Sequence, residues 1–168
     1  MNLSKNQKIL LAVIGIVLIL FVVFNAVWLM NYKSYDRFER DDYTRPFGSS
    51  YVLSKDGFHY NIKYPDYLQF SGNLGITNEA DTLSMIIWPQ AFKSNEYEVG
   101  IIIYDAGSEY SFYLYLDSDL NMNHDKMNLT EESSDIAEKL LEERRDEIEE
   151  MYSLAENEWN LSSDTKIV

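Results

Sequence analysis

Residues 117–125 carry the side chains whose types and spacing most resemble those of a ligand site. Calcium is a hard cation that takes six to eight oxygen ligands, and alternating Asp and Asn in a loop can wrap around one. The spacing therefore predicts a calcium site, and the alternative is a polar connection rich in turn-forming residues. The candidate ligands, at every second position, are Asp117, Asp119, Asn121, Asn123 and Asp125.

Over nine residues this run resembles the opening of an EF-hand or dockerin-type calcium loop, in which the same five residues would occupy loop positions 1, 3, 5, 7 and 9. Two positions depart from that pattern. Met122 stands where the sharp turn requires glycine, and Asn128 stands where a bidentate glutamate would close the coordination shell. Calcium is the cofactor that the resemblance implies, and the two departures favour the polar connection instead.

Other chemistries have little support in the sequence. The absence of cysteine excludes disulfides, thiolate metal sites and cysteine nucleophiles. A net charge of -14 disfavours nucleic acid as a partner, because it repels phosphate. His59 and His124 are the two histidines, and neither accompanies a nucleophile elbow. We therefore expect a non-enzymatic protein, with a membrane-tethered hydrolase as the weaker alternative.

The elements that position any site begin with an apolar segment at residues 9–30, which holds 22 residues and no charge. At about 1.5 Å per residue a helix of this length measures about 33 Å, enough to cross a hydrocarbon core of about 30 Å. The segment predicts a membrane anchor. The alternatives are a cleaved signal peptide, whose apolar region would usually be shorter than this one, and a buried core helix. The anchor residues include Ile9, Leu18, Phe21 and Trp28.

The orientation of the anchor follows from the basic residues around it. Lys5 and Lys8 precede the segment in a basic tail at residues 1–8, and four further basic residues follow it, interleaved with acids. A count of Lys and Arg alone would place the following side in the cytoplasm. A long domain can cross largely regardless of its charge, however, and the tail resembles a signal-anchor leader. We expect a single-pass protein of the cell membrane, with its N-terminus in the cytoplasm and its domain outside.

The remaining chain predicts an α+β domain at residues 46–160, joined to the anchor by a charged stalk at 31–45 and followed by a tail at 161–168. Alternating apolar and polar residues and turn signals such as Asp56-Gly57 predict a small antiparallel sheet of about four to six strands within 49–116. A polar loop would cover 117–129. One long amphipathic helix at 131–158 would pack its apolar stripe on the sheet.

The chain contains thirteen tyrosines, and Tyr113 and Tyr115 alternate with residues that point to the expected core. Rings on an exposed sheet face anchor protein interfaces or stack on sugars, whereas a sheet covered on both faces would bury them. We therefore expect an anchored interaction or accessory domain of the cell envelope. Its expected partners are the membrane and another envelope protein, and a calcium- or carbohydrate-binding module is the alternative.

Overall fold

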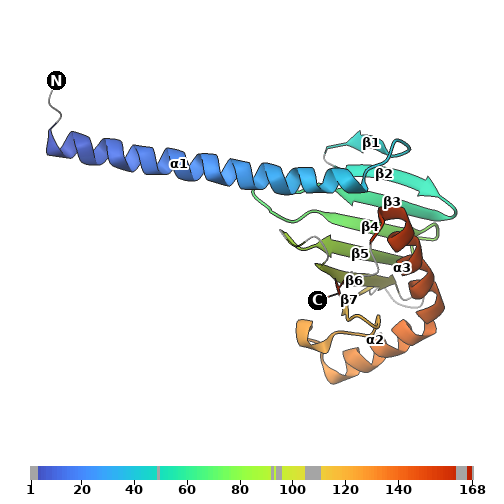
Figure 1. Cartoon of the computed structure of the whole chain (residues 1–168). Coiled ribbons are helices and arrows are strands. Elements are labelled where there is room, and N and C mark those ends of the chain that lie inside the picture. The colour runs from blue at the N-terminus through green and yellow to red at the C-terminus, as the bar shows by residue number, and fades with distance from the viewer. Residues whose placement is uncertain are drawn as a thin grey trace.

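The computed structural model describes residues 4–48, 50–91, 93, 96–104, 111–161 and 166–167, and it confirms the α+β class (Figure 1). One long helix precedes an antiparallel sheet, and two helices follow it. The helices are α1 Lys5–Lys33, η1 Ser34–Phe38, η2 His124–Lys126, α2 Glu131–Glu143 and α3 Arg145–Trp159. The strands are β1 Thr44–Phe47, β2 Ser50–Lys55, β3 Phe58–Lys63, β4 Asn73–Asn78, β5 Leu83–Pro89, β6 Glu96–Tyr104, β7 Ser111–Leu116 and β8 Lys166–Ile167.

The sheet runs in the order β1 to β7, with each strand antiparallel to the next, and β8 pairs parallel with β6. The expectation of four to six strands was therefore wrong. It missed β4, whose sequence NLGITN contains glycine and asparagine and has a low intrinsic preference for strands. The two neighbouring strands hold β4 along its length. It also missed β1, an edge strand that contains Pro46.

The predicted turn between β2 and β3 is confirmed. Asp56 has a φ of 52° and Gly57 a φ of 82°, so both central residues adopt the left-handed conformation that a two-residue hairpin turn requires. The turn fixes the register, in which Lys55 lies opposite Phe58 and Tyr51 opposite Ile62.

One face of the sheet forms the core with the helices. Along β3, β5 and β7 buried residues alternate with more exposed ones, and α3 and the end of α1 lie over the face that the buried residues form, with α2 at its edge (Figure 1). The apolar stripe of the C-terminal helices packs on it as predicted. The sheet supplies Ile62, Leu74, Ile76, Met85, Ile87, Ile101 and Leu114, and the helices supply Ala137, Leu141, Ile148, Met151, Ala155 and Trp159.

The expectation of one continuous helix at 131–158 was wrong, because the helix breaks at Arg144, where φ is -107° and ψ is 11°. A straight helix over that range would measure about 42 Å, whereas seven strands span about 29 Å. The break allows α3 to cross the sheet and α2 to turn away at its edge (Figure 1). Glu147 secures the junction, since it pairs with Arg144 at 2.6 Å and accepts a hydrogen bond from the buried Asn78 at 2.7 Å.

Within the described residues α1 is the one helix that is long and apolar enough to cross a membrane. None of its most apolar 18-residue window is buried, and the side chains of Ile9, Leu18 and Phe21 are all more than half exposed. A core helix would be covered by the rest of the protein. The exposure is instead that of a membrane span or a signal sequence.

The chain passes directly from α1 into the core. Residues of the segment expected to form a stalk are buried beneath the sheet, with Tyr35 1% and Phe38 2% exposed. The hydroxyl of Tyr35 accepts a hydrogen bond from the backbone N–H of Gly72 at 3.0 Å. A Cβ atom at Gly72 would lie 2.1 Å from the carbonyl oxygen of Lys63, so only glycine fits between this strand end and the Tyr35 ring.

We predict that Gly72→Ala lowers the free energy of unfolding by about 3 kcal/mol, because the added methyl group meets backbone that cannot move aside. Gly75→Ala is the matched control. A Cβ at Gly75 would lie 3.7 Å from that of Asn61, an ordinary contact, and we expect its effect to stay within about 1 kcal/mol. Chemical denaturation of the full chain in detergent, followed by near-ultraviolet circular dichroism, measures both. Equal losses in the two variants would contradict the packing described here.

We also predict that the stability of the domain falls as pH rises above 10. Burial raises the pKa of Tyr35 to about 12, whereas an unfolded tyrosine titrates near 10. Between these values the unfolded chain has lost the proton and the folded chain retains it. Each pH unit therefore costs up to about 1.4 kcal/mol for this residue. Unfolding curves between pH 8 and 11.5 measure the slope, and Tyr35→Phe should reduce it. An unchanged slope in that variant would contradict the assignment to Tyr35.

Candidate functional site

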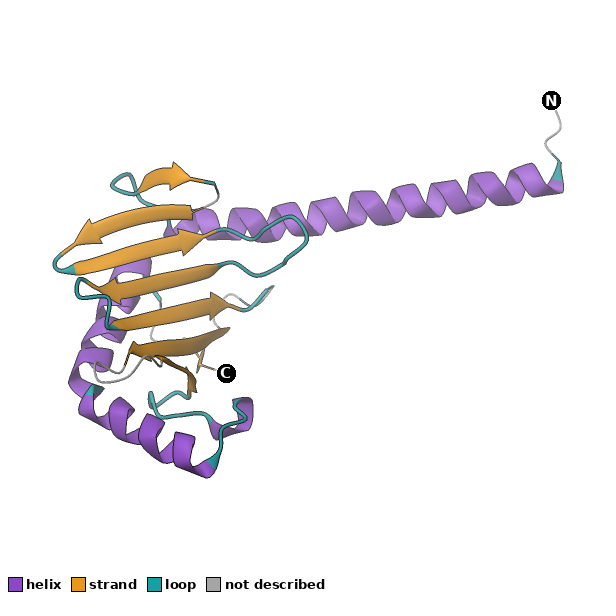
Figure 2. Ribbon diagram, turned by 180° about the vertical axis from the view of Figure 1, so that it is seen from behind, coloured by secondary structure: helices purple, strands orange, loops and turns teal. Residues whose placement is uncertain are grey.

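The face of the sheet that points away from the helices carries no helix in the described part of the chain (Figure 2). We call it the open face. The cross-strand register shows that its character changes along the strand order. One row begins with the polar residues Ser54, His59, Thr77 and Ser84 on β2 to β5, and it ends with Ile102 and Tyr113 on β6 and β7. The apolar residues of this row lie on β6 and β7, and Ile86 and Trp88 of β5 add to them on the same face.

Three aromatic side chains form a cluster there, which we call the aromatic patch: Trp88, Tyr113 and Tyr115. The ring centroids of Tyr113 and Tyr115 lie 5.2 Å apart, and each lies 6.1 Å from that of Trp88. Gly100 lies beneath the indole, since a Cβ there would be 2.8 Å from one of its carbon atoms. The glycine therefore allows the tryptophan ring to rest directly on the strand backbone.

The rim of the aromatic patch carries an ion pair between Glu98 and Lys126, with Nζ and Oε1 separated by 3.1 Å. The Lys126 ammonium also lies 5.7 Å from the centroid of the Tyr115 ring. Burial, followed by hydrogen bonding to Tyr115, raises the pKa of Tyr113 well above its usual value. Tyr113 thus stays neutral at physiological pH. An apolar centre with charges at its edge is the usual composition of a protein-binding surface.

The sequence pointed to Tyr113 and Tyr115 as interface candidates, and the structure brings these two together on the open face, where Tyr113 is 41% exposed. Sequence reasoning missed Trp88. Its run, LSMIIW, is apolar almost throughout, so it indicates a strand without showing which residues face away from the core. The alternation within β5 was the available signal, since Leu83, Met85 and Ile87 are buried and the residues between them are not.

The five predicted calcium ligands lie on the connection between β7 and α2. A carboxylate oxygen of Asp117 accepts hydrogen bonds from the backbone N–H groups of Asp119 and Asn121, both at 2.9 Å. The side-chain oxygen of Asn121 accepts one from Arg145 at 2.7 Å, and this guanidinium also bonds two carbonyl oxygens of the turn at 3.2 Å. Asn123 and Asp125 lie at the start of η2.

This arrangement folds the connection as a polar turn held by an arginine from α3. Among the described residues no group of three or more acidic or histidine side chains lies close enough to hold a metal ion. The calcium site stays a prediction. The same turn borders a cavity of about 370 Å³, in which His124 lies 3.2 Å from Glu138.

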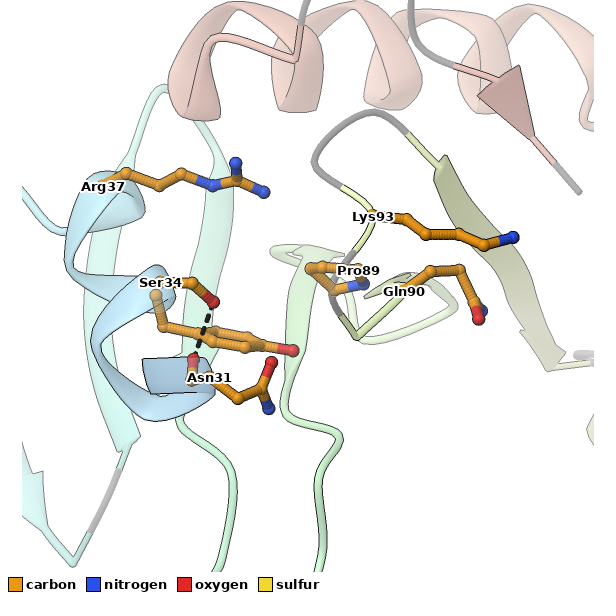
Figure 3. Close-up of a pocket in the computed structure, with 7 residues that line it drawn as sticks. Asn31, Ser34, Arg37, Pro89, Gln90 and Lys93 are labelled. Atoms are coloured by element: carbon orange, nitrogen blue, oxygen red, sulfur yellow. Dashed lines mark hydrogen bonds between the residues drawn. The ribbon is translucent and has the colours of Figure 1, made fainter. Parts of the chain in front are cut away.

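A second cavity, of about 260 Å³, lies between the end of α1, η1 and the connection from β5 to β6 (Figure 3). Arg37 reaches into it from η1, while Lys93 points away from Arg37. Both cations have partners, because Arg37 bonds the Tyr97 hydroxyl at 3.4 Å and Lys93 pairs with Glu96 at 2.5 Å. The cavity thus presents amide, hydroxyl and guanidinium groups, without a nucleophile and base in contact.

Comparison of the chain with protein-family models, with curated proteins and with solved structures finds no match.

We predict that Gly100→Ala displaces Trp88, since the new methyl group would occupy the position of the indole edge. The near-ultraviolet circular dichroism of the tryptophan should weaken, and the free energy of unfolding should fall by about 1 to 3 kcal/mol. Gly75→Ala, in the same cross-strand row as Gly100, is the control: it should leave the tryptophan signal unchanged and alter the free energy of unfolding by no more than about 1 kcal/mol. An unaltered tryptophan signal in Gly100→Ala would contradict the stacked arrangement.

Proposed function

We propose that this chain is a single-pass, membrane-anchored interaction domain that faces the outside of the cell and binds another envelope protein through its aromatic patch. The observation that carries the proposal is the cluster of Trp88, Tyr113 and Tyr115 on a sheet face that no described helix covers. Large rings of this kind contribute most of the binding energy in protein interfaces.

The proposed anchor is α1, and its exposure supports this role. Side chains along the apolar segment reach 65% exposure at Ile19 and 69% at Met30. Leaving such a surface in water is unfavourable, at about 25 cal/mol per Å² of apolar area, and transfer into lipid removes that cost. Retention of the segment is part of the proposal, since its contacts with the domain, described below, would be lost on cleavage.

The proposed topology gains support from the partners of the basic residues that follow the segment. Arg40 pairs with the buried Glu158 at 3.7 Å, and Arg45 donates to the Gly48 carbonyl oxygen at 2.7 Å. Arg37 is bonded within the domain as well. These residues belong to the folded domain, and a long domain crosses largely regardless of its charge, so Lys33 is the basic residue nearest the following end of the span. Lys5 and Lys8 on the preceding side then determine the orientation, with that side in the cytoplasm.

The geometry of the patch favours a protein partner over a carbohydrate. A sugar stacks on a ring whose flat face is open. Here the Trp88 and Tyr113 planes meet at 77° and the Tyr113 and Tyr115 planes at 82°, so Tyr113 packs edge to face against both other rings, while the Trp88 and Tyr115 planes are tilted by 41°. The result is a compact apolar surface with a charged rim, which suits burial against an apolar protein surface.

We predict that a photoreactive phenylalanine derivative at position 113 gives a discrete covalent adduct with another protein in intact cells. The same residue at position 77, on the polar part of the open face, is the control and should give little adduct. Adding Tyr115→Ser should reduce the yield at position 113 several-fold. Equal background labelling at both positions, with the domain folded, would reject the aromatic patch as a protein interface. Adducts that a soluble oligosaccharide competes away would favour the carbohydrate alternative.

A further inference from the structure

The connection between β3 and β4, residues 64–72, extends beyond the sheet along α1 (Figure 2). We call it the β3–β4 loop. Two of its rings pack on Phe24 of α1, with centroid separations of 5.7 Å for Tyr67 and 5.4 Å for Phe70. Trp28 lies 5.2 Å from Tyr67 as well. The loop therefore contacts the apolar segment itself and not only the end of α1.

The side chain at the tip of this loop has little cover from the protein. Leu68 is 83% exposed, more than any other large apolar side chain among the described residues outside or inside the anchor, and its neighbour Tyr67 is 43% exposed. Such exposure in water costs free energy and has no structural purpose in the domain. It is the pattern expected of a side chain that another phase covers.

The length of α1 places the loop at the depth of lipid. The residues just before Ile9 are polar or charged, so the hydrocarbon core begins no earlier than that position. From Ile9 to Phe24 is 16 residues, or about 24 Å, which is shorter than a hydrocarbon core of about 30 Å. The core must therefore continue past Phe24 by about four residues, to the level of Trp28. The loop residues that contact Phe24 and Trp28 share that depth.

The polar groups of the loop are paired in a way that suits this environment. The Trp28 indole N–H donates to the carbonyl oxygen of Asp66 at 3.0 Å, and the Tyr67 hydroxyl donates to the side-chain oxygen of Asn25 at 2.7 Å. The Asn31 amide donates to the Phe70 carbonyl oxygen. The Asp66 carboxylate pairs with Lys63 at 3.4 Å. Anchor side chains thus satisfy loop groups that would otherwise be costly at the edge of the hydrocarbon.

We infer that the β3–β4 loop inserts into the outer leaflet, with Leu68 and Tyr67 among the lipids, and that it seats the domain on the membrane at a fixed height. The inference rests on the proposed function in taking α1 as a membrane span and, for the choice of leaflet, in the proposed orientation. Its partner is the lipid itself, at the boundary between acyl chains and headgroups. The aromatic and aliphatic residues of the loop suit that region, since rings with a polar atom favour the interface.

The test uses the full chain in phosphatidylcholine vesicles, whose zwitterionic surface does not repel a protein of net charge -14. Because the chain has no cysteine, single substitutions can each carry one environment-sensitive fluorophore. Leu68→Cys reports on the loop and Leu18→Cys on the anchor. Glu79→Cys, in the exposed connection between β4 and β5 at the opposite end of the strands, is the water control.

We expect the probes at positions 18 and 68 to emit at shorter wavelength than the probe at 79, and lipid-attached quenchers to quench them several-fold more strongly. A probe at 68 that matches the one at 79, while position 18 is in lipid, would overturn the inference and leave the anchor intact. A probe at 18 that stays in water would overturn the proposed anchor, and the loop inference with it. Oxygen accessibility of a spin label at position 68 provides a second measurement that does not depend on the fluorophore.

Discussion

The domain is joined to its apolar helix by packed side chains, and the other features of the molecule depend on this joint. α1 continues into η1 without a flexible linker, and η1 places Tyr35 and Phe38 beneath the sheet. The Tyr35 hydroxyl then bonds the backbone of Gly72, at the point where the β3–β4 loop returns to the sheet. Helix, core and loop therefore form one body, and the position of each determines the position of the others.

The two faces of the sheet therefore differ: one packs in the core and the other does not. One face forms the core, where α3 and η1 pack on the buried residues of β3 to β7. The other face contributes little to the core and carries the aromatic patch, which we propose as the surface for recognition. The Trp88 indole can approach the backbone of this face closely because Gly100 provides no side chain beneath its edge. The strands that carry the aromatic patch on one side thus carry the centre of the core on the other.

Much of the architecture could be predicted from local patterns. Alternation in β3 identified its buried side, Asp56-Gly57 identified the hairpin, and the uninterrupted apolar run identified the helix that stands outside the domain. The remainder depended on distant partners. β4 is a strand because β3 and β5 flank it, and the break at Arg144 reflects the width of the sheet that α3 crosses.

The candidate site shows the same division. Alternation alone placed Tyr113 and Tyr115 opposite the core, but no local signal joined them to Trp88, which lies on another strand. The alternating acids at 117–125 were conspicuous in sequence, yet the hydrogen bonds of Asp117 and Asn121 depend on a turn and on Arg145, which is distant in the chain. The role of Leu68 becomes visible only when the loop is seen beside α1.

The absence of a hinge between α1 and the domain has a mechanical consequence. A spanning helix adapts to a thinner or thicker bilayer by changing its tilt. In the proposed arrangement the domain must tilt together with the helix, because the two move as one rigid body. The direction in which Trp88 and its neighbours face along the cell surface would then vary with membrane thickness, so the lipid composition around the protein would adjust which partners it can reach.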